Sequence, residues 1–270
     1  MGYIIGSFNT CRFTGTGKHD IGILSDIILS ERFDIIALQE VFRPEALNLL
    51  KKRLPGWECS HGRPGNGPAC DFGFGFLWNT KRIRECSKDS QPIIFEQYKS
   101  NIRMRRNPFY GRFAPSGLLG GAFFEIRLID IHLWCGSKSS PQDIFQRNEE
   151  YKLVTNEIHN YINTRRYGDN MPAYTIILGD YNLFCLYCDQ NDNQNQTVKT
   201  KQNEKTTLST DNESFANDYD HFSYDENRFV GTSINVERID TVSKYCYNNF
   251  EKHREKVSDH IPIKLELVLN

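Results

Sequence analysis

Residues 175–183, with the sequence TIILGDYNL, join a short aliphatic run to two polar residues two positions apart. This pattern is typical of a buried strand that leaves its sheet at Gly-Asp-x-Asn. Because residues two apart on an extended backbone project to the same side, Asp180 and Asn182 are expected to point to one place. A carboxylate and an amide there suit a reaction that deprotonates water and stabilises an oxyanion. A simple Asp/Asn turn after a strand is the alternative interpretation.

Composition limits the classes of protein that fit this chain. Its 270 residues suffice for one large two-layer domain or two small ones, and a hydrophobic content of 39% allows a substantial core. A net charge of -1 excludes a bulk attraction to nucleic acid, so any such attraction has to be local. No apolar run is long enough for a bilayer, so we expect no membrane partner. The N-terminus enters an apolar segment without a charged leader. The 8 cysteines include one CxxC motif, without a second one to complete a zinc site. We therefore expect reduced thiols in a cytoplasmic protein.

Polar residues recur at the ends of the predicted strands. Apolar runs predict strands in 3–8, 33–40, 72–78, 121–126, 128–134 and 238–242, and helical spacing predicts helices in 18–33, 43–54 and 141–166. The strand ends carry Asn9, Glu40, His132, Asp180 with Asn182, and Asp259-His260. One such ending means little, but an ordered series indicates a single rim. Its chemistry suits metal-assisted attack of water on a phosphoryl group, because Mg²⁺ needs only one or two protein carboxylates and a histidine shares the developing charge.

Two further segments stand out in composition. Residues 103–112 (RMRRNPFYGR) are the one concentrated basic patch, and they fit either a charged sheet edge or a phosphate-binding segment. Residues 189–214 are rich in Asn, Gln, Thr, Lys and Asp and contain only two aliphatic side chains. We expect this segment to be a polar, mobile surface insertion within a single domain that spans residues 1–270.

The ordered set of motifs resembles the endonuclease/exonuclease/phosphatase superfamily, and within it the deoxyribonuclease I-like branch. The resemblance covers nearly the whole chain apart from the polar insertion, and it rests on Phe8-Asn9, Leu38-Gln39-Glu40, Arg106-Asn107-Pro108-Phe109, Ile131-His132, Gly179-Asp180-Tyr181-Asn182, Arg238-Ile239-Asp240 and Ser258-Asp259-His260. It implies an α/β fold of four layers, in which two mixed sheets pack together and are flanked by helices. The site is then expected at one edge of the sheets.

The resemblance also implies roles for individual residues. Glu40 is expected to hold Mg²⁺, with Mn²⁺ or Ca²⁺ as substitutes, and Asn9 and Asp259 lie beside the metal. Asp180 is expected to orient or deprotonate water and Asn182 to contact phosphate. The remaining implied roles are a His260–Asp240 pair, a second phosphate-facing imidazole at His132, and substrate contacts from Arg106, Arg103 and Arg112.

Two positions depart from the branch. The carboxylate that partners the first histidine is replaced by Phe72, with Asp71 next to it. The structural disulfide is not expected, because Glu237 occupies the partner position of Cys185.

These features predict a divalent-metal-dependent phosphodiesterase that hydrolyses nucleic acid, with DNA favoured over RNA. An enzyme of this kind without a leader peptide is expected to need an inhibitory or activating protein partner. The alternatives are a phosphoesterase acting on a phosphoinositide, sphingomyelin or another small phosphoester, and a non-catalytic nucleic-acid-binding module.

Overall fold

Two mixed β-sheets form the centre of the computed structural model, which describes residues 2–63, 72–86, 93–94, 102–117, 124–137, 139–166, 172–191 and 197–269. The first sheet has the spatial order β12 (Thr232–Arg238), β13 (Ile263–Leu269), β1 (Gly2–Phe13), β2 (Ile35–Val41), β4 (Gly73–Asn79) and β3 (Trp57–Gly62). The second has the order β10 (Val198–Lys201), β11 (Asp220–Asp225), β9 (Ala173–Asp180), β8 (Glu125–His132), β7 (Phe109–Pro115) and β5 (Ile83–Glu85), with β6 (Ile93–Ile94) beside β7.

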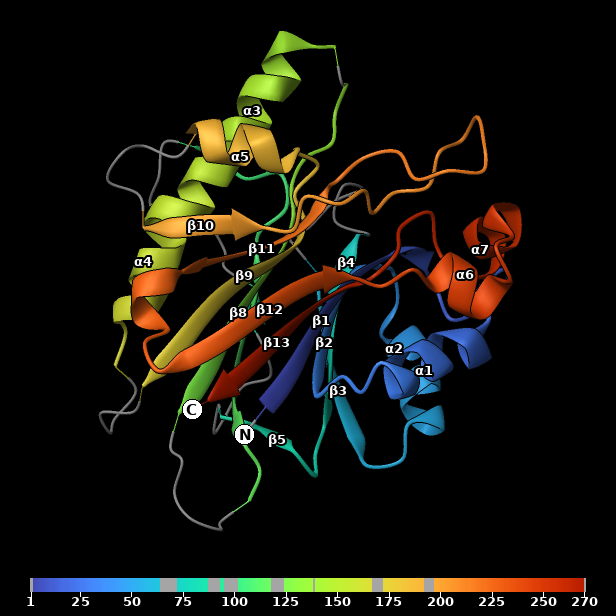
Figure 1. Cartoon of the computed structure of the whole chain (residues 1–270), viewed down its shortest axis with the longest axis horizontal. Coiled ribbons are helices and arrows are strands. Elements are labelled where there is room, and N and C mark those ends of the chain that lie inside the picture. The colour runs from blue at the N-terminus through green and yellow to red at the C-terminus, as the bar shows by residue number, and fades with distance from the viewer. Residues whose placement is uncertain are drawn as a thin grey trace.

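Helices cover the outer face of each sheet (Figure 1). Beside the first sheet lie α1 (Ile21–Ser30), α2 (Pro44–Arg53), α6 (Thr241–Cys246) and α7 (Phe250–Lys256). Beside the second lie α3 (Pro141–Lys152), the π-helix η2 (Leu153–Ile158), α4 (His159–Thr164) and α5 (Cys185–Asn191), and a short 3-10 turn, η3 (Glu226–Arg228), precedes β12. The predicted four-layer α/β sandwich is confirmed.

Alternating side chains explain why the layers form. In β9, Ile176 and Leu178 belong to the core between the two sheets, whereas Ile177 packs in the core beneath α3, η2 and α4. In β1, Tyr3 and Ile5 face the central core and Phe8 faces the core shared with α1 and α2. Both faces of these strands are buried, which accounts for the continuous apolar runs in the sequence.

Two sequence expectations about the fold need correction. The predicted strands 121–126 and 128–134 are represented by one strand, β8, with residues 121–123 outside the described part. The predicted strand 238–242 is wrong, because β12 ends at Arg238 and α6 begins at Thr241.

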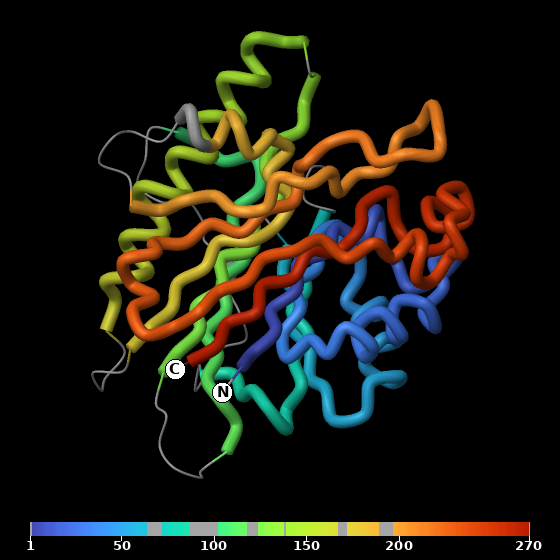
Figure 2. Tube along the Cα trace, viewed as in Figure 1, coloured from blue at the N-terminus to red at the C-terminus, as the bar shows by residue number. Residues whose placement is uncertain are grey.

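Residues 189–214, expected to be a mobile insertion, contribute regular structure in their described part. The segment contains the end of α5 and all of β10, which pairs with β11 and buries Val198. Composition missed this role because a short edge strand needs few apolar side chains. Residues 202–218 then pass from the second sheet towards α6 and α7 (Figure 2).

None of the helices in the described ranges has the length and apolar character that a bilayer span requires.

A buried polar contact joins the two sheets directly beneath the strand ends. Gln39 Nε2 on β2 donates to Asp130 Oδ1 on β8 at 2.6 Å and to Ser7 Oγ at 3.1 Å. Gln39 Oε1 and Asp130 Oδ2 have no hydrogen-bond partner among the described residues. Burial raises the pKa of Asp130 well above its ordinary value, against the opposing effect of the Gln39 hydrogen bond. A protonated Asp130 carboxyl group carries an O–H donor, and Gln39 Oε1 is an acceptor without a donor.

We therefore expect Asp130→Asn to stabilise the protein at neutral pH. The unfolded chain releases the Asp130 proton near its ordinary pKa, whereas the folded chain retains it, so this group costs stability as the pH rises above that value. Asparagine removes the cost and can still accept from Gln39. The unfolding temperature of Asp130→Asn should thus exceed that of the wild type by an amount that grows from about pH 4 to about pH 8.

Asp130→Ala is the comparison, because it also removes the carboxyl group but leaves the Gln39 amide without its acceptor, so it should be less stable than Asp130→Asn by about 1–3 kcal/mol at every pH. A lower unfolding temperature for Asp130→Asn throughout the pH range contradicts a protonated Asp130.

Candidate active site

The two parallel strand pairs deliver their carboxyl ends to one edge of the sandwich. In the first sheet, β1 and β2 run parallel with Asn9 opposite Gln39. In the second, β8 and β9 run parallel with His132 opposite Asp180. The sheets face each other, so the polar residue after each apolar run reaches a common rim. This brings together the strand-end residues that the sequence singled out.

Bulges in β1 and β2 shape the side of the rim that carries Glu40, the expected metal ligand, and this side is called the metal side below. The pairing register of β1 shifts between Asn9 and Phe13, and that of β2 shifts between Gln39 and Val41. Glu40 has a φ of 60°, a value that non-glycine residues rarely adopt. Its carboxylate is held by the backbone N–H of Arg12 at 3.0 Å and by Asn9 Nδ2 at 3.3 Å. The strained backbone thus fixes the Glu40 carboxylate at the rim.

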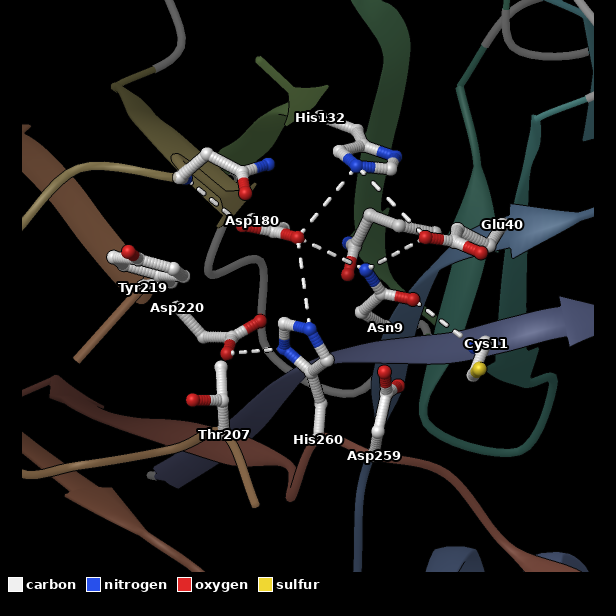
Figure 3. A network of polar contacts seen from close by, with 12 residues as sticks. Asn9, Cys11, Glu40, His132, Asp180, Thr207, Tyr219, Asp220, Asp259 and His260 are labelled. Carbon is white, nitrogen blue, oxygen red and sulfur yellow. Dashed lines mark hydrogen bonds and ion pairs between the residues drawn. The ribbon is translucent and has the colours of Figure 1, made fainter. Parts of the chain in front are cut away.

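Asp180 lies at the centre of the network (Figure 3). Its Oδ2 accepts from Asn9 Nδ2 at 2.9 Å and lies 3.6 Å from His132 Nε2 and 3.8 Å from His260 Nε2. Its Oδ1 accepts from the backbone N–H of Asn182 at 2.9 Å. Asp180 is therefore a buried carboxylate placed between two imidazoles.

Asp220 is the partner of His260, which corrects the expected His260–Asp240 pair. His260 Nδ1 lies 2.8 Å from Asp220 Oδ2, and Asp220 is fully buried at the start of β11. Asp240 instead caps α6, where its side chain accepts from the backbone N–H of Ser243 at 2.9 Å. The expected pairing fails because the chain turns into a helix at Asp240. Thr207 lies opposite His260 in an isolated antiparallel bridge.

Among the described residues, no carboxylate occupies the partner position for His132 that the resemblance to the deoxyribonuclease I-like branch implies. Its Nε2 faces Asp180 and, at 3.9 Å, Glu40. Its Nδ1 is buried without a hydrogen-bond partner in the described ranges, and the ring of Phe72 packs edge-on against the imidazole at 6.0 Å. The structure therefore places the ring of Phe72 against His132, where a carboxylate was expected. Asp71 lies outside the described residues.

Asn182 lies beside the site in a conformation set by its backbone. Its φ is 48°, and its Nδ2 donates to the Leu133 carbonyl at 3.0 Å. The amide nitrogen is thus already used to join the ends of β8 and β9.

The three predicted substrate-binding arginines occupy different environments. Arg106 is buried, donates to the His132 and Leu133 carbonyls at 3.3 and 3.1 Å, and lies over the ring of Phe72. This geometry gives Arg106 a positioning role for the end of β8, and its expected contact with the nucleic-acid backbone stays a prediction. Arg112 forms an ion pair with Glu125 at the opposite end of β8 from His132, so its assignment to the site is wrong. Arg103 is exposed.

The pKa shifts separate the two histidines. Burial lowers the pKa of His132 well below its ordinary value, and the charges of Arg106 and His260 lower it further. Burial also opposes a charge on His260, but the charge and hydrogen bond of Asp220, together with the charges of Asp180 and Asp259, hold the pKa of His260 well above its ordinary value. The arrangement favours a neutral His132 and a cationic His260.

The carboxylates show the opposite effect of burial. Burial raises the pKa of Asp180 to about 7, while the charge of His260 lowers it. Burial raises the pKa of Glu40 too, and the nearby charge of Asp259 adds to that rise. Burial opposes a charge on Asp259 as well, but the charge of His260, the hydrogen bond from Cys11 and the charge of Lys18 act together to lower its pKa. At this rim, acidic side chains therefore outnumber the cationic side chains that lie close to them.

This charge pattern fits a divalent cation near Glu40 and Asp259. Within the described residues no group of three or more His, Cys, Asp or Glu side chains forms a ready-made metal cage. Mg²⁺ does not require one, because it keeps several waters and binds through one or two carboxylates. A cation there would relieve the repulsion between Glu40 and Asp259. Asn9 acts on both sides of this site, since its Nδ2 orients the carboxylates and its Oδ1 accepts from the backbone N–H of Cys11 at 3.0 Å.

Sequence reasoning missed two residues at the rim. Asp220 is the first residue of β11, which runs antiparallel to β9, so a rule about the residues that follow strands could not point to it. Cys11 lies near the metal side, and burial, together with Asp259 and Glu40, raises its pKa to about 12. No disulfide joins any two of the described cysteines.

No family model matches the chain, and no curated protein is similar to it in sequence. Solved structures do match it. A TDP2 structure from D. rerio, complexed with single strand DNA product, is 17% identical with a TM-score of 0.65 over 98% of each chain. An endonuclease/exonuclease/phosphatase from Bacteroides vulgatus is 13% identical with a TM-score of 0.66 over 100% of each chain. A mannosyl-6-phosphatase from Bacteroides thetaiotaomicron is 16% identical with a TM-score of 0.61, and the match covers 99% of this chain and 100% of that one.

The protein has the fold of the endonuclease/exonuclease/phosphatase superfamily. The resemblance to this superfamily seen in the sequence motifs is therefore confirmed at the level of the fold.

Proposed function

We propose that this protein is a divalent-metal-dependent phosphodiesterase that hydrolyses nucleic acid, with DNA as the favoured substrate. The observation that carries the proposal is the buried Asp180 carboxylate, which lies between His132 and His260 and one hydrogen bond from the Asn9–Glu40 pair. This constellation contains a proton acceptor, a cationic donor and a metal-binding carboxylate around one point. Metal-assisted hydrolysis of a phosphoester uses these three functions.

Each side chain has a role that follows from its environment. Asp180 orients the attacking water and takes its proton, and its position is fixed by Asn9 and the Asn182 backbone. His260, kept cationic by Asp220, donates hydrogen bonds to the charge that develops on the phosphoryl oxygens. Neutral His132 contacts the phosphate from the opposite side of Asp180. A divalent cation held by Glu40 and Asp259 supplies Lewis-acid stabilisation of that charge when bound.

Charges around the rim support a polyanionic substrate. Arg12, Lys18, Arg103 and Arg105 are exposed cations on the segments that border the site. Lys18 acts on Asp259 and Cys11 through its charge, which places it close to the metal side. The D. rerio neighbour was solved with a DNA strand, which favours nucleic acid over other phosphodiesters. Neutralised phosphates release counterions, so local cations can bind nucleic acid despite the net charge of -1.

A second candidate function is hydrolysis of a small phosphoester. The B. thetaiotaomicron neighbour, a mannosyl-6-phosphatase, shares the fold. The same central residues could serve a small substrate, because attack of water on its phosphorus uses the same proton acceptor and the same cation.

Metal removal tests the proposed function. We expect the purified protein to nick supercoiled plasmid in Mg²⁺ or Mn²⁺ and to lose this activity completely in EDTA, because Glu40 and Asp259 cannot supply the charge of the cation. The measurement is the conversion of supercoiled to open-circular plasmid over time, with excess Mg²⁺ restoring activity after EDTA.

A parallel assay measures phosphate release from sugar phosphates and phosphoinositides. Intact plasmid together with rapid phosphate release would favour the small-phosphoester alternative. Intact plasmid with retained DNA binding and no hydrolysis of any substrate would favour a binding module.

A further inference from the structure

One flank of the rim is aromatic, whereas the opposite flank is charged. Tyr219 comes directly before Asp220 and lies beside the His260 network (Figure 3). Its ring centroid is 5.2 Å from that of Phe184, which is 5.8 Å from that of Tyr187 on α5. The three rings, here called the aromatic row, run from the site to the surface. Tyr219 is 7% exposed, and Tyr187 at the far end is 50% exposed.

The backbone holds this row firmly against the site. The backbone N–H of Tyr181 donates to the Tyr219 carbonyl at 2.8 Å, and that of Cys185 donates to Asp218 Oδ2 at 3.0 Å. The first bond ties Tyr219 to the residue that follows Asp180, and the second ties the start of α5 to the residue before Tyr219. The row is therefore continuous with the catalytic rim and does not belong to an independent surface patch.

We propose that the aromatic row is a stacking subsite for an unpaired nucleobase next to the scissile phosphate. This inference rests on the proposed nuclease function, and it specifies that the substrate of the nuclease is single-stranded or frayed nucleic acid. Aromatic side chains stack on any base through its π-face, and a base inside a duplex already has both faces covered. The cations Arg12 and Lys18 lie on the β1 side of the rim, where they can take the sugar–phosphate chain while the base lies on the aromatic side.

An exposed leucine strengthens the choice of a base as occupant. Leu186, adjacent to Tyr187 on α5, is 64% exposed, so the outer end of the row has an apolar border. A flat heterocycle can cover such a surface and keep its polar edges in water. The row provides no side-chain cation for a second phosphate, since its members are tyrosine and phenylalanine.

The test is binding of a short single-stranded DNA and its duplex in EDTA, measured by fluorescence anisotropy. Tyr187→Ala should weaken single-strand binding roughly 5-fold to 140-fold, the range found for loss of one stacked base. Tyr187→Phe keeps the ring and should bind as the wild type does. Tyr247→Ala is the matched control, because Tyr247 is an exposed tyrosine, 85% accessible, that follows α6 on the other side of the molecule (Figure 1).

An abasic scan identifies the base that stacks. Replacing single nucleotides by an abasic residue should weaken wild-type binding most at one position, and Tyr187→Ala should abolish this dependence, as a double-mutant cycle requires. Thermal unfolding of Tyr187→Ala checks that the fold is retained.

The outcomes separate the subsite from the function on which it rests. Unchanged single-strand binding by Tyr187→Ala, or an equal loss for single strand and duplex, overturns the stacking subsite and leaves a nuclease that nicks plasmid. No binding or cleavage of any nucleic acid by the wild type, with hydrolysis of a sugar phosphate, overturns both proposals.

Discussion

Replacing Asp180 by asparagine is expected to reduce phosphodiester hydrolysis by about 10²–10⁴-fold, the usual contribution of a general base. Asparagine has nearly the same shape and can still accept from the Asn182 backbone N–H that holds Asp180 Oδ1 at 2.9 Å. It cannot take a proton from water. The loss should therefore appear in kcat, with little change in the binding of substrate.

Stability distinguishes a chemical effect from damage to the fold. Asp180 is buried, and burial raises its pKa to about 7, so its charge is costly in the folded protein. Removing that charge should leave the unfolding temperature unchanged or higher. Asp26→Asn, on an exposed position of α1, controls for the purification and assay of an Asp→Asn variant. If Asp180→Asn retains more than about a tenth of the wild-type kcat, Asp180 does not act as the base.

The fold followed from the sequence because both sheets are built on apolar runs of the right length. The run before Asp180 and the run before Glu40 are buried on both faces, so each run had to be a strand inside a covered sheet. Their polar ends then had to meet at one edge, because parallel strands end on the same side. These local rules located Asn9, Glu40, His132 and Asp180, whereas His260 precedes β13, which reaches the same edge because it runs antiparallel to β1.

The remaining site residues depended on tertiary structure that periodicity does not encode. Asp240 stands after an apolar residue in the sequence, as a strand-end residue does, but the chain turns into α6 there and uses the carboxylate as a helix cap. Asp220 reaches His260 only because β11 pairs with β9 and places Asp220 opposite Asp180. A contact between residues 40 positions apart cannot be predicted from either segment alone.

The basic segment 103–112 shows the same limit. Its arginines are adjacent in sequence, yet Arg106 is buried under the end of β8 and Arg112 pairs with Glu125 at the other end of that strand. The strand β7 carries them apart, because each residue advances about 3.3 Å along it. Charge clustering in sequence therefore overestimated the clustering of charge at the rim.

The pair Asp220 and Asp240 provides a matched test of the corrected site. Asp220→Asn is expected to reduce hydrolysis by roughly 10²–10⁴-fold, because the amide cannot keep His260 cationic and lets the imidazole adopt the wrong tautomer. The physical basis is the 2.8 Å contact from His260 Nδ1 to a fully buried carboxylate that raises the pKa of His260 against the effect of burial. The readout is kcat on a single-stranded oligonucleotide at saturating Mg²⁺.

Asp240→Asn makes the same chemical change at the position that the motif pattern favoured. Asparagine caps a helix as well as aspartate does, so α6 and the unfolding temperature should be preserved. Hydrolysis should stay within about a factor of two of the wild type, because surface changes away from a site rarely cost more than about 0.5 kcal/mol. The reverse result, with Asp240→Asn inactive and Asp220→Asn active, would restore the motif assignment and require His260 to leave Asp220 when substrate binds. Equal activity of both variants would show that His260 needs no carboxylate partner, since the contact at 2.8 Å would then have no part in the chemistry.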